Sequence, residues 1–567
     1  QGDFLYASNQ TYLRNIYIKT PGSEIQRTAE LRYASLDALQ NDFAKTVFNL
    51  YITNTRLQVK DILLFAPQLR NNPALRNPND IWYVNIIGNG TLDQLNFRTL
   101  QFKGLSNTQL DANGTLTGLM NPKQAGGNFR INRFHTTQTD LALFTGQRLS
   151  TPQINLPEEF DINGNISGNA GKLHTNLNGN SSAGAVAING SFADLVNPNA
   201  TSYNASIRTS GLRLGSILRQ PDMIGSVSGN FLLNGKGLTP DAINTKFTGN
   251  ISSLGYNHYQ YHNIRASGSL RGTTFDIKTD VKDPNVDLDL AVSGNFSDNP
   301  SFKINGMVDS IKLQPLNFTP DPMVFRGRID GTVANLSADN PDINVLVTKA
   351  LFVSNEDRLP LDTVQINSGR NDTANYIQLK SDIANAMLVG QYRLTELGSI
   401  IQNTIQPYFA VTPGSKTPQL HPYNFRFTAD VVYTPILSQF VPGLTTMETI
   451  HADGSFATGE GMNATLTTPY ISYNGNEIRN VNLKAFTSAN GLKIQGNVAR
   501  VQSGSSFDIY NARIDATALN NNIDFSLGID DSNAKNKYHL SGLVSQPTTG
   551  TYAIKLRPDS LMLNYEM

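Results

Sequence analysis

The side chains that could do chemistry in this chain are few, and they form no recognised catalytic or metal-binding pattern. His258 and His262 share one face of an alternating strand, but no carboxylate pattern accompanies them. In Asp287-Leu288-Asp289, strand alternation puts both carboxylates on the solvent face, although their spacing resembles a metal pair. Gly225-Ser226-Val227-Ser228-Gly229 has Val where a nucleophile elbow needs Ser. Gly235-Lys236-Gly237 lacks the third glycine of a dinucleotide loop. We therefore expect no catalytic residue, no metal and no cofactor, and we expect that the protein is not an enzyme.

The composition excludes further classes of function. The 567 residues include no cysteine, so disulfides, zinc–thiolate sites and iron–sulfur clusters are absent. The 45 basic and 45 acidic side chains cancel, and no basic cluster is present, which argues against nucleic acid as a partner. Only 16% of residues are charged, against roughly 25% in an ordinary soluble domain, and asparagine, with 63 copies, replaces much of the charge.

No apolar run approaches the roughly 18 to 20 residues of a membrane helix. The chain begins Gln1-Gly2-Asp3, without an initiator methionine or an apolar leader. We therefore expect that any signal peptide or membrane anchor lies outside these residues.

Period-two alternation is the clearest order in the sequence. Across residues 286–296 the even-numbered side chains are apolar or glycine, and the odd-numbered ones are mostly polar and small. This pattern predicts a strand with one apolar and one wet face. Residues 275–281 and 302–308 alternate in the same way, and short turn sequences such as Asp283-Pro284 separate these runs. Short connections join antiparallel neighbours, so we expect a meander.

A glycine-centred pentapeptide recurs ten times, as apolar, small polar, glycine, small polar, apolar. Alternation places each glycine on the apolar face, where it costs roughly 0.5 to 1 kcal/mol relative to alanine. The repetition suggests that the glycines let the sheet bend toward its apolar face, or let another backbone come close. Ordinary strand glycine near turns remains the alternative. The predicted bend glycines are Gly114, Gly164, Gly190, Gly229, Gly249, Gly268, Gly294, Gly331, Gly454 and Gly496.

A longer unit also returns. Tyr256-Asn257 followed by Tyr261-His262-Asn263-Ile264 matches Tyr473-Asn474 followed by Ile478-Arg479-Asn480-Val481 at identical spacing. Weaker echoes are Val59-Lys60-Asp61-Ile62 and Leu361-Asp362-Thr363-Val364. The intervals between copies are irregular, which argues against a solenoid of fixed period and favours a long sheet with insertions.

Helical spacing of apolar residues is local. It predicts short helices within residues 35–43, 61–69, 139–149 and 397–409. We therefore expect four segments: 1–150, an N-terminal groove segment with short helical insertions; 151–395, a central segment of glycine-centred repeats; 396–425, a helical insertion and loop; and 426–567, a C-terminal groove segment.

A sheet with one apolar face must cover that face, and so few helical residues cannot do it. Either the sheet packs shut on itself, or it forms a trough whose apolar lining meets a greasy ligand. We expect the second: an all-β fold with a long, curved, mainly antiparallel sheet folded into a U-shaped (β-taco) groove, with a few short helices. The residues expected to line the groove are Phe275, Ile277, Val286, Leu288, Leu290, Val292, Phe296, Phe302, Ile304, Ile329, Val333, Val345 and Val347.

Three features carry a resemblance to a known family: residues 56–69, the segments Leu397-Gly398-Ser399-Ile400 and Ile405-Gln406-Pro407-Tyr408-Phe409, and the glycine-centred repeats. With these the whole chain resembles the TamB translocation and assembly module family of the AsmA-like group, specifically its Bacteroidota members. The resemblance implies a taco-shaped sheet with a hydrophobic groove. It also implies an anchor in the inner membrane, a path across the periplasm, and work with an Omp85-type outer-membrane barrel. We expect the anchor and the C-terminal region that would meet the barrel to lie outside these residues.

The expected function is that of a periplasmic bridge-like lipid-transfer protein. Phospholipid acyl chains would slide along the apolar face while head groups stay in water, supporting outer-membrane biogenesis. Two alternatives stay open: a periplasmic scaffold or chaperone for outer-membrane or autotransporter protein assembly with the barrel, and a surface adhesin-type β-solenoid, which should show a short fixed period. An outer-membrane barrel fits poorly, because the chain has a single tryptophan and irregular strand lengths.

Overall fold

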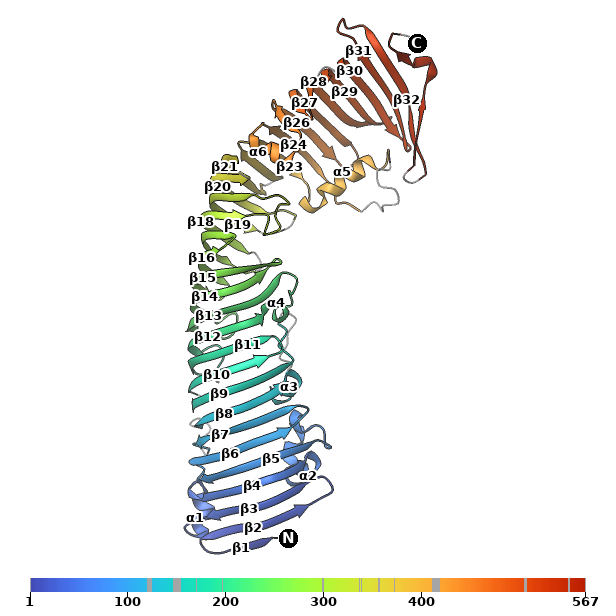
Figure 1. Cartoon of the computed structure of the whole chain (residues 1–567). Coiled ribbons are helices and arrows are strands. Elements are labelled where there is room, and N and C mark those ends of the chain that lie inside the picture. The colour runs from blue at the N-terminus through green and yellow to red at the C-terminus, as the bar shows by residue number, and fades with distance from the viewer. Residues whose placement is uncertain are drawn as a thin grey trace. The chain divides into compact units, whose positions relative to one another are not determined.

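The fold is described from a computed structural model that covers residues 2–119, 125–145, 154–169, 171–195, 197–297, 300–335, 337, 339–354, 357–371, 373–409, 419–503, 507–548 and 551–565. Strands hold 66% of the chain and helices 10%, so the prediction of an all-β fold with a mainly antiparallel sheet and a few short helices is confirmed. The chain divides into two units, Gln1–Asp287 and Leu288–Met567, which are described separately (Figure 1). This boundary lies inside the predicted central segment, and the four-segment division stays a prediction.

Unit 1 is an antiparallel meander in which each strand pairs with the next along the chain. Its strands are β1 (Asp3–Tyr6), β2 (Gln10–Lys19), β3 (Glu24–Arg32), β4 (Val47–Gln58), β5 (Ile81–Gly90), β6 (Gln94–Gly104), β7 (Thr108–Thr117), β8 (Gly126–Thr137), β9 (Glu159–Asn169), β10 (Lys172–Ser181), β11 (Gly184–Ala193), β12 (Ser202–Arg213), β13 (Ile224–Lys236), β14 (Asn244–Tyr256), β15 (Tyr259–Arg271) and β16 (Thr274–Asp283).

Short helices connect some of these strands. They are α1 (Leu36–Asn41), α2 (Val59–Phe65), α3 (Gln138–Thr145) and α4 (Leu214–Ile217), with the 3-10 turns η1 (Phe43–Lys45), η2 (Pro67–Asn71) and η3 (Pro73–Leu75). Helices α2, α3 and α4 lie along the same side of unit 1 (Figure 1).

Unit 2 continues the antiparallel pattern after β17 (Val286–Asn295), the strand that contains the boundary. Its strands are β18 (Ser301–Lys312), β19 (Val324–Asn335), β20 (Asp342–Ser354), β21 (Asp357–Arg370), β22 (Asn375–Ser381), β23 (Ala384–Gln391), β24 (Asn424–Val431), β25 (Leu444–Met447), β26 (Ile450–Ala457), β27 (Gly461–Tyr473), β28 (Asn476–Ser488), β29 (Gly491–Ser503), β30 (Phe507–Leu519), β31 (Asn522–Asp530), β32 (Asn536–Thr548), β33 (Thr551–Leu556) and β34 (Met562–Leu563). Its helices are α5 (Leu397–Ile405) and α6 (Pro435–Phe440), with η4 (Leu394–Glu396) and η5 (Pro558–Ser560).

The four predicted helices correspond to α1, α2, α3 and α5, although residues 146–149 of the predicted third helix lie outside the described residues. The weak echo at residues 59–62 falls inside α2 and is therefore no strand repeat, which corrects that interpretation. Helices α4 and α6 were not predicted, because four and six residues are too few to show helical periodicity.

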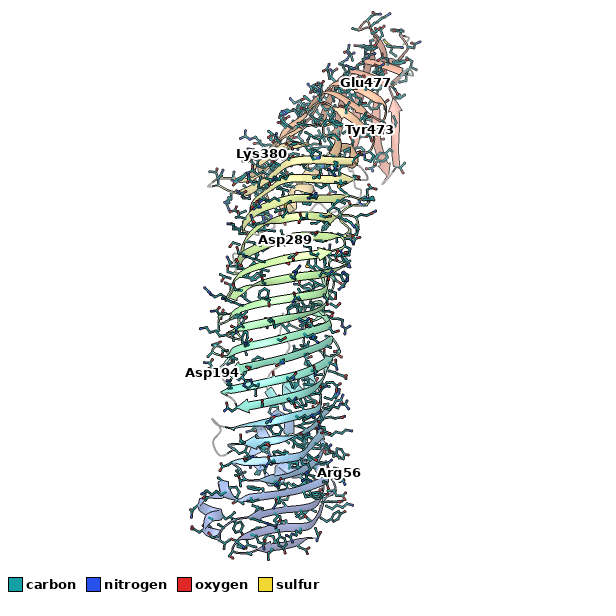
Figure 2. All side chains as sticks on the ribbon, turned by 60° about the vertical axis from the view of Figure 1, so that its left-hand side comes forward. Arg56, Asp194, Asp289, Lys380, Tyr473 and Glu477 are labelled. Atoms are coloured by element: carbon teal, nitrogen blue, oxygen red, sulfur yellow. The ribbon has the colours of Figure 1, made fainter. Side chains whose placement is uncertain are left out.

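The strand register gathers apolar side chains on one face. Leu177 on β10 stands opposite Ile188 on β11, and Ile188 stands opposite Ile207 on β12. The side chains between them, such as Asn176 and Asn189, point to the other face and are exposed. Side chains project from both faces of the ribbon (Figure 2). Each described strand of this region therefore has one apolar and one wet face, as the alternation predicts.

Several strands are kinked by one residue in the left-handed backbone region. Asn480 in β28 has φ 51°. The pairing between β27 and β28 is interrupted at this point, because Asn480 and Pro469 are skipped between the pairs Thr468–Val481 and Tyr470–Arg479. Across this kink, the successive apolar residues Ile478 and Val481 are three positions apart instead of two. A left-handed residue inside a strand turns the strand and shifts its alternation, so the apolar stripe continues through the bend. The same arrangement occurs at Asn263 in β15, Lys349 in β20 and Asn511 in β30.

The long repeat in the sequence is the signature of this kink. Asn257 and Asn474 each lie in a tight hairpin turn with φ 48°, and Asn263 and Asn480 lie six residues later, both with φ 51°. Two consecutive left-handed residues make the type I′ turn that suits a twisted hairpin. The repeated unit is therefore a hairpin turn followed by a kink.

We expect that Asn480→Val lowers the free energy of unfolding by about 1 to 3 kcal/mol, because a β-branched residue is strained in the left-handed region. Asn480→Gly is the matched control and should be nearly neutral, since glycine adopts this conformation freely. Urea unfolding followed by circular dichroism measures both. Equal losses for the two variants would mean that the amide of Asn480, and not its backbone conformation, matters.

A buried carboxylate holds the hairpin end beside the kink of β15. Asp283 accepts hydrogen bonds from the Tyr259 hydroxyl at 2.6 Å, the Asn285 amide at 2.8 Å and the His262 amide at 2.9 Å. Burial alone would raise the pKa of Asp283, but these donors outweigh it and hold the pKa below its usual value.

A lowered pKa means that ionised Asp283 stabilises the fold above about pH 4 and that this contribution disappears as the pH falls through the folded-state value. We expect the urea midpoint of the native chain to fall more steeply between pH 6 and pH 2.5 than that of Asp283→Asn. Parallel pH profiles would contradict the assigned role of this carboxylate.

Candidate functional site

The candidate site is the apolar face of the sheet, which is best defined in unit 1 across β9 to β12. The large side chains of this face are half-buried, in contrast to the closed core that a second sheet layer would produce. Of the apolar side chains that these four strands contribute, only Ala205, at 5% exposed, is buried. The large side chains that form this face are Phe160, Ile162, Ile166, Leu173, Leu177, Val186, Ile188, Phe192, Tyr203 and Ile207.

A pocket of about 290 Å³ opens on this face under α4. Its apolar lining includes Phe160, Leu177 and Ile188 from β9 to β11, and Leu212 and Ile217 from the end of β12 and α4. One of its few polar lining residues is Ser181. The Ser181 hydroxyl already donates a hydrogen bond to the Gly184 carbonyl at 2.8 Å. The walls therefore offer dispersion contacts and few hydrogen bonds, which suits a hydrocarbon chain.

The roof of this pocket is built by local backbone contacts. The Asn155 amide donates to the Ile217 carbonyl at 2.7 Å, and this ties the segment before β9 to the end of α4. Gly215 lies against β13, where an added Cβ would meet the Ile224 carbonyl oxygen at 1.7 Å. Only glycine permits this approach, so the short helix is held over the sheet. Arg213, the residue after the lining residue Leu212, is exposed, and its guanidinium donates to the Ser182 carbonyl.

The ten predicted bend glycines all lie within strands. Their bend role stays a prediction, whereas the structure shows what occupies the space beside several of them. Phe97 and Phe129 flank Gly114 on the neighbouring strands, and their ring centroids are 6.4 Å apart. Positions two strands apart would otherwise be separated by about 9.6 Å. A Cβ on Gly249 would come within 2.9 Å of the Phe231 ring.

Neighbouring side chains thus lean over the glycines and fill the gaps, as in the rescue of strand glycine by aromatic rings. The same holds at Gly454, beneath Phe427, and at Gly496, between Ile514 and Leu483. The gaps beside these glycines are therefore filled by neighbouring side chains.

The predicted lining residues of unit 1 are Phe275, Ile277 and Val286. Ile277 stands opposite Gly268 and is half-buried, whereas Phe275 is 8% and Val286 4% exposed. These two side chains leave little surface for a ligand. Their role in a groove stays a prediction.

The predicted lining residues of unit 2 begin on β17, where Leu288, Leu290 and Val292 are half-buried. The structure brings another set together by register: Phe302 faces Val333, Ile304 faces Gly331, Gly331 faces Val345, and Ile329 faces Val347. Phe296 follows the end of β17, is 60% exposed, and lies 6.2 Å from the ring of Phe302.

Farther along unit 2, the chain itself occupies the apolar face. Ile400 on α5 is fully buried and packs with Tyr392, Phe425 and Phe456. Phe409, after α5, packs against Leu492 and Ala518 and stacks on Tyr552. The segment 397–409 therefore covers hydrophobic surface that is left half-exposed in unit 1.

In unit 2, a two-pronged ion pair joins β30 and β31; its carboxylate is buried and its guanidinium is half-exposed. Arg513 binds Asp530 through both guanidinium nitrogens, at 2.7 and 2.8 Å, and this hydrogen bonding lowers the pKa of Asp530. Among the described residues, no group of three histidine, cysteine or acidic side chains could hold a metal ion. The apolar face offers dispersion contacts of the kind that a hydrocarbon chain makes.

Comparisons with known proteins add no assignment: no family model, no curated protein and no solved structure matches the chain. Across the described ranges, no helix is both long enough and apolar enough to cross a membrane.

Sequence reasoning missed two features of the site. The roof formed by residues 154–158 and α4 gave no periodic signal, because it depends on single hydrogen bonds. The kink residues left a readable signal, since each interrupts the apolar alternation by a step of three residues.

Proposed function

We propose that this protein binds and conducts phospholipid acyl chains along the apolar face of its sheet. The observation that supports the proposal is the row of half-exposed apolar side chains on β9 to β12, with the pocket under α4. Monomeric proteins rarely leave contiguous apolar surface open, and such surface marks an interaction site.

The chemistry of the face favours a lipid over a peptide or a sugar. Each methylene group removed from water contributes about 0.8 kcal/mol, and the half-open face would supply part of this along the length of a chain. The polar side chains of the opposite face, mostly Asn, Ser and Thr, keep the protein in water. The exposed Arg213, next in sequence to the lining residue Leu212, would give a lipid phosphate a cation within reach of solvent.

The resemblance to the TamB family sets the proposal in a cellular context. The protein would act in the periplasm, move phospholipid between the inner and outer membranes, and cooperate with an Omp85-type barrel. Because no residue performs a chemical step in this mechanism, the proposal is not that of an enzyme.

The single tryptophan allows a direct test. Trp82 lies on the apolar face of β5, opposite Leu57, and its ring contacts Phe102 at 5.4 Å. The chain is incubated with vesicles of phosphatidylcholine carrying dibrominated acyl chains and then re-isolated. Bound acyl chains should quench Trp82, and they should also quench Phe160→Trp in a Trp82→Phe background.

The matched control is Asn176→Trp in the Trp82→Phe background, because this position lies on the wet face of β10. Its emission should not change. Re-isolated protein free of lipid, with all three tryptophans unquenched, would refute lipid binding and leave the scaffold function as the better proposal.

A further inference from the structure

Helix α2 presents two adjacent large apolar side chains to solvent. Phe65 is 87% exposed and Leu64 is 70% exposed, and Leu69, just beyond the helix, is 40% exposed. In water such exposure is unfavourable, and contiguous exposed apolar side chains mark a contact site. We define these three residues as the α2 tip.

The α2 tip is held out from the sheet by a fixed platform. Val59, at the start of the helix, is fully buried, and its amide donates to the Asp80 carbonyl at 2.9 Å. The Asp61 carboxylate accepts from the hydroxyls of Thr20 at 2.5 Å and Ser23 at 2.6 Å. These contacts tie α2 to the turn between β2 and β3 and to the residue before β5, so the exposure of the tip follows from anchored geometry. Arg56 in Figure 2 marks the end of β4, the strand that leads into this helix.

Within residues 59–80, which carry the tip, all exposed charged side chains are basic. Lys60, Arg70 and Arg76 are exposed. The acidic residues of the same segment, Asp61 and Asp80, are half-buried and already accept hydrogen bonds, Asp80 from the Asn77 amide. An apolar tip with a basic collar is complementary to an anionic bilayer, whose head groups are negative and whose interior is apolar.

We propose that the α2 tip docks this protein on a membrane surface containing anionic phospholipid. Leu64 and Phe65 insert among the acyl chains near the head groups, and the three basic residues contact lipid phosphates. A second copy of the chain would bring two basic collars together, which opposes pairing through this surface. The proposal does not depend on lipid transport along the sheet.

Flotation of the full chain with vesicles tests it. Vesicles of phosphatidylcholine with about one third phosphatidylglycerol should bind the protein, and binding should weaken in high salt. The double variant Leu64→Ser/Phe65→Ser should lose at least tenfold in affinity. The triple variant Lys60→Gln/Arg70→Gln/Arg76→Gln should lose about fivefold per charge, and only on anionic vesicles.

Matched controls use other exposed residues of the same types. Leu232, at 60% exposed, and Phe318, at 63%, replaced by serine, should leave binding unchanged. Lys172, Lys246 and Lys278, all exposed, replaced by glutamine, control for net charge. Equal losses in the control and tip variants, or no binding of the native chain to anionic vesicles, would overturn the proposal. Binding of a protein partner by the tip in place of vesicles would overturn it as well.

A spectroscopic readout separates this proposal from lipid transport. Phe65→Trp in a Trp82→Phe background should shift its emission to shorter wavelength on anionic vesicles. In the Leu64→Ser/Phe65→Ser variant, brominated lipid delivered in detergent micelles should still quench Trp82. Loss of the Trp82 signal with intact vesicle docking would count against transport and not against the tip.

Discussion

Leu177→Asp should abolish lipid binding at the pocket under α4 and strongly reduce phospholipid transfer between vesicles. Leu177 lines the pocket and faces Gly164 and Ile188 on the neighbouring strands. Removing its contacts costs about 1.5 to 3 kcal/mol of binding, and an acyl chain seated over a carboxylate would add the cost of desolvating a charge. We expect at least a tenfold loss in affinity, measured with a fluorescent phospholipid.

Asn176→Asp is the matched control, because it adds the same charge to the wet face of the same strand. It should leave transfer unchanged. Leu177 is half-buried, so without lipid the new carboxylate keeps water and the fold should survive, which circular dichroism will show. Leu177→Asn gives an uncharged second variant. Normal transfer by folded Leu177→Asp would exclude this position from the lipid path, and collapse of the fold in both variants would indicate a closed core.

Ile400→Ala should lower the free energy of unfolding of unit 2 by about 2 to 5 kcal/mol. Ile400 is fully buried among Tyr392, Phe425 and Phe456, and deleting a buried isoleucine side chain to Cβ leaves a cavity. Hydrogen exchange of the α5 amides and urea unfolding by circular dichroism measure the effect. Because α5 covers apolar surface of unit 2, the variant should also increase phospholipid crosslinking from a photoreactive residue at position 427.

Two neighbours act as controls. Ile401 is 49% exposed on the same helix, so Ile401→Ala should change stability by less than about 0.5 kcal/mol. Tyr392→Phe keeps the buried ring and removes a hydroxyl that has no hydrogen-bond partner in the structure. Burial raises the pKa of Tyr392 to about 12, and loss of this unpaired group should cost little stability. Similar losses for Ile400→Ala and Ile401→Ala would contradict the packing of α5 on the sheet.

The strands and their faces could be predicted because alternation is a local property. In β17 each residue from Val286 onward reveals its face from its neighbours two positions away, and the prediction needs no knowledge of pairing. The glycine-centred repeats were readable for the same reason. The side chains that cover these glycines could not be predicted, because they belong to neighbouring strands and the sequence does not give the register between strands. The Phe231 ring, which lies over Gly249 from β13, is an example.

The kinks could be predicted from the sequence only in part. The repeat around Asn263 and Asn480 was visible as a repeat, but its meaning depends on backbone φ, which asparagine permits without requiring. Once the structure gives that conformation, the three-residue step in the apolar pattern explains how the stripe passes through the bend.

The sequence alone determined that this protein is all-β, antiparallel and apolar on one face, since the strand period and turn residues act over a few positions. Tertiary structure decided which parts of that face are open. Half-exposed side chains on β10 and a fully buried Ile400 on α5 come from equally apolar patterns, and they differ because a distant segment packs on one region and not on the other. It also decided that Leu64 and Phe65 face water, because the hydrogen bonds of Asp61 set the orientation of their helix.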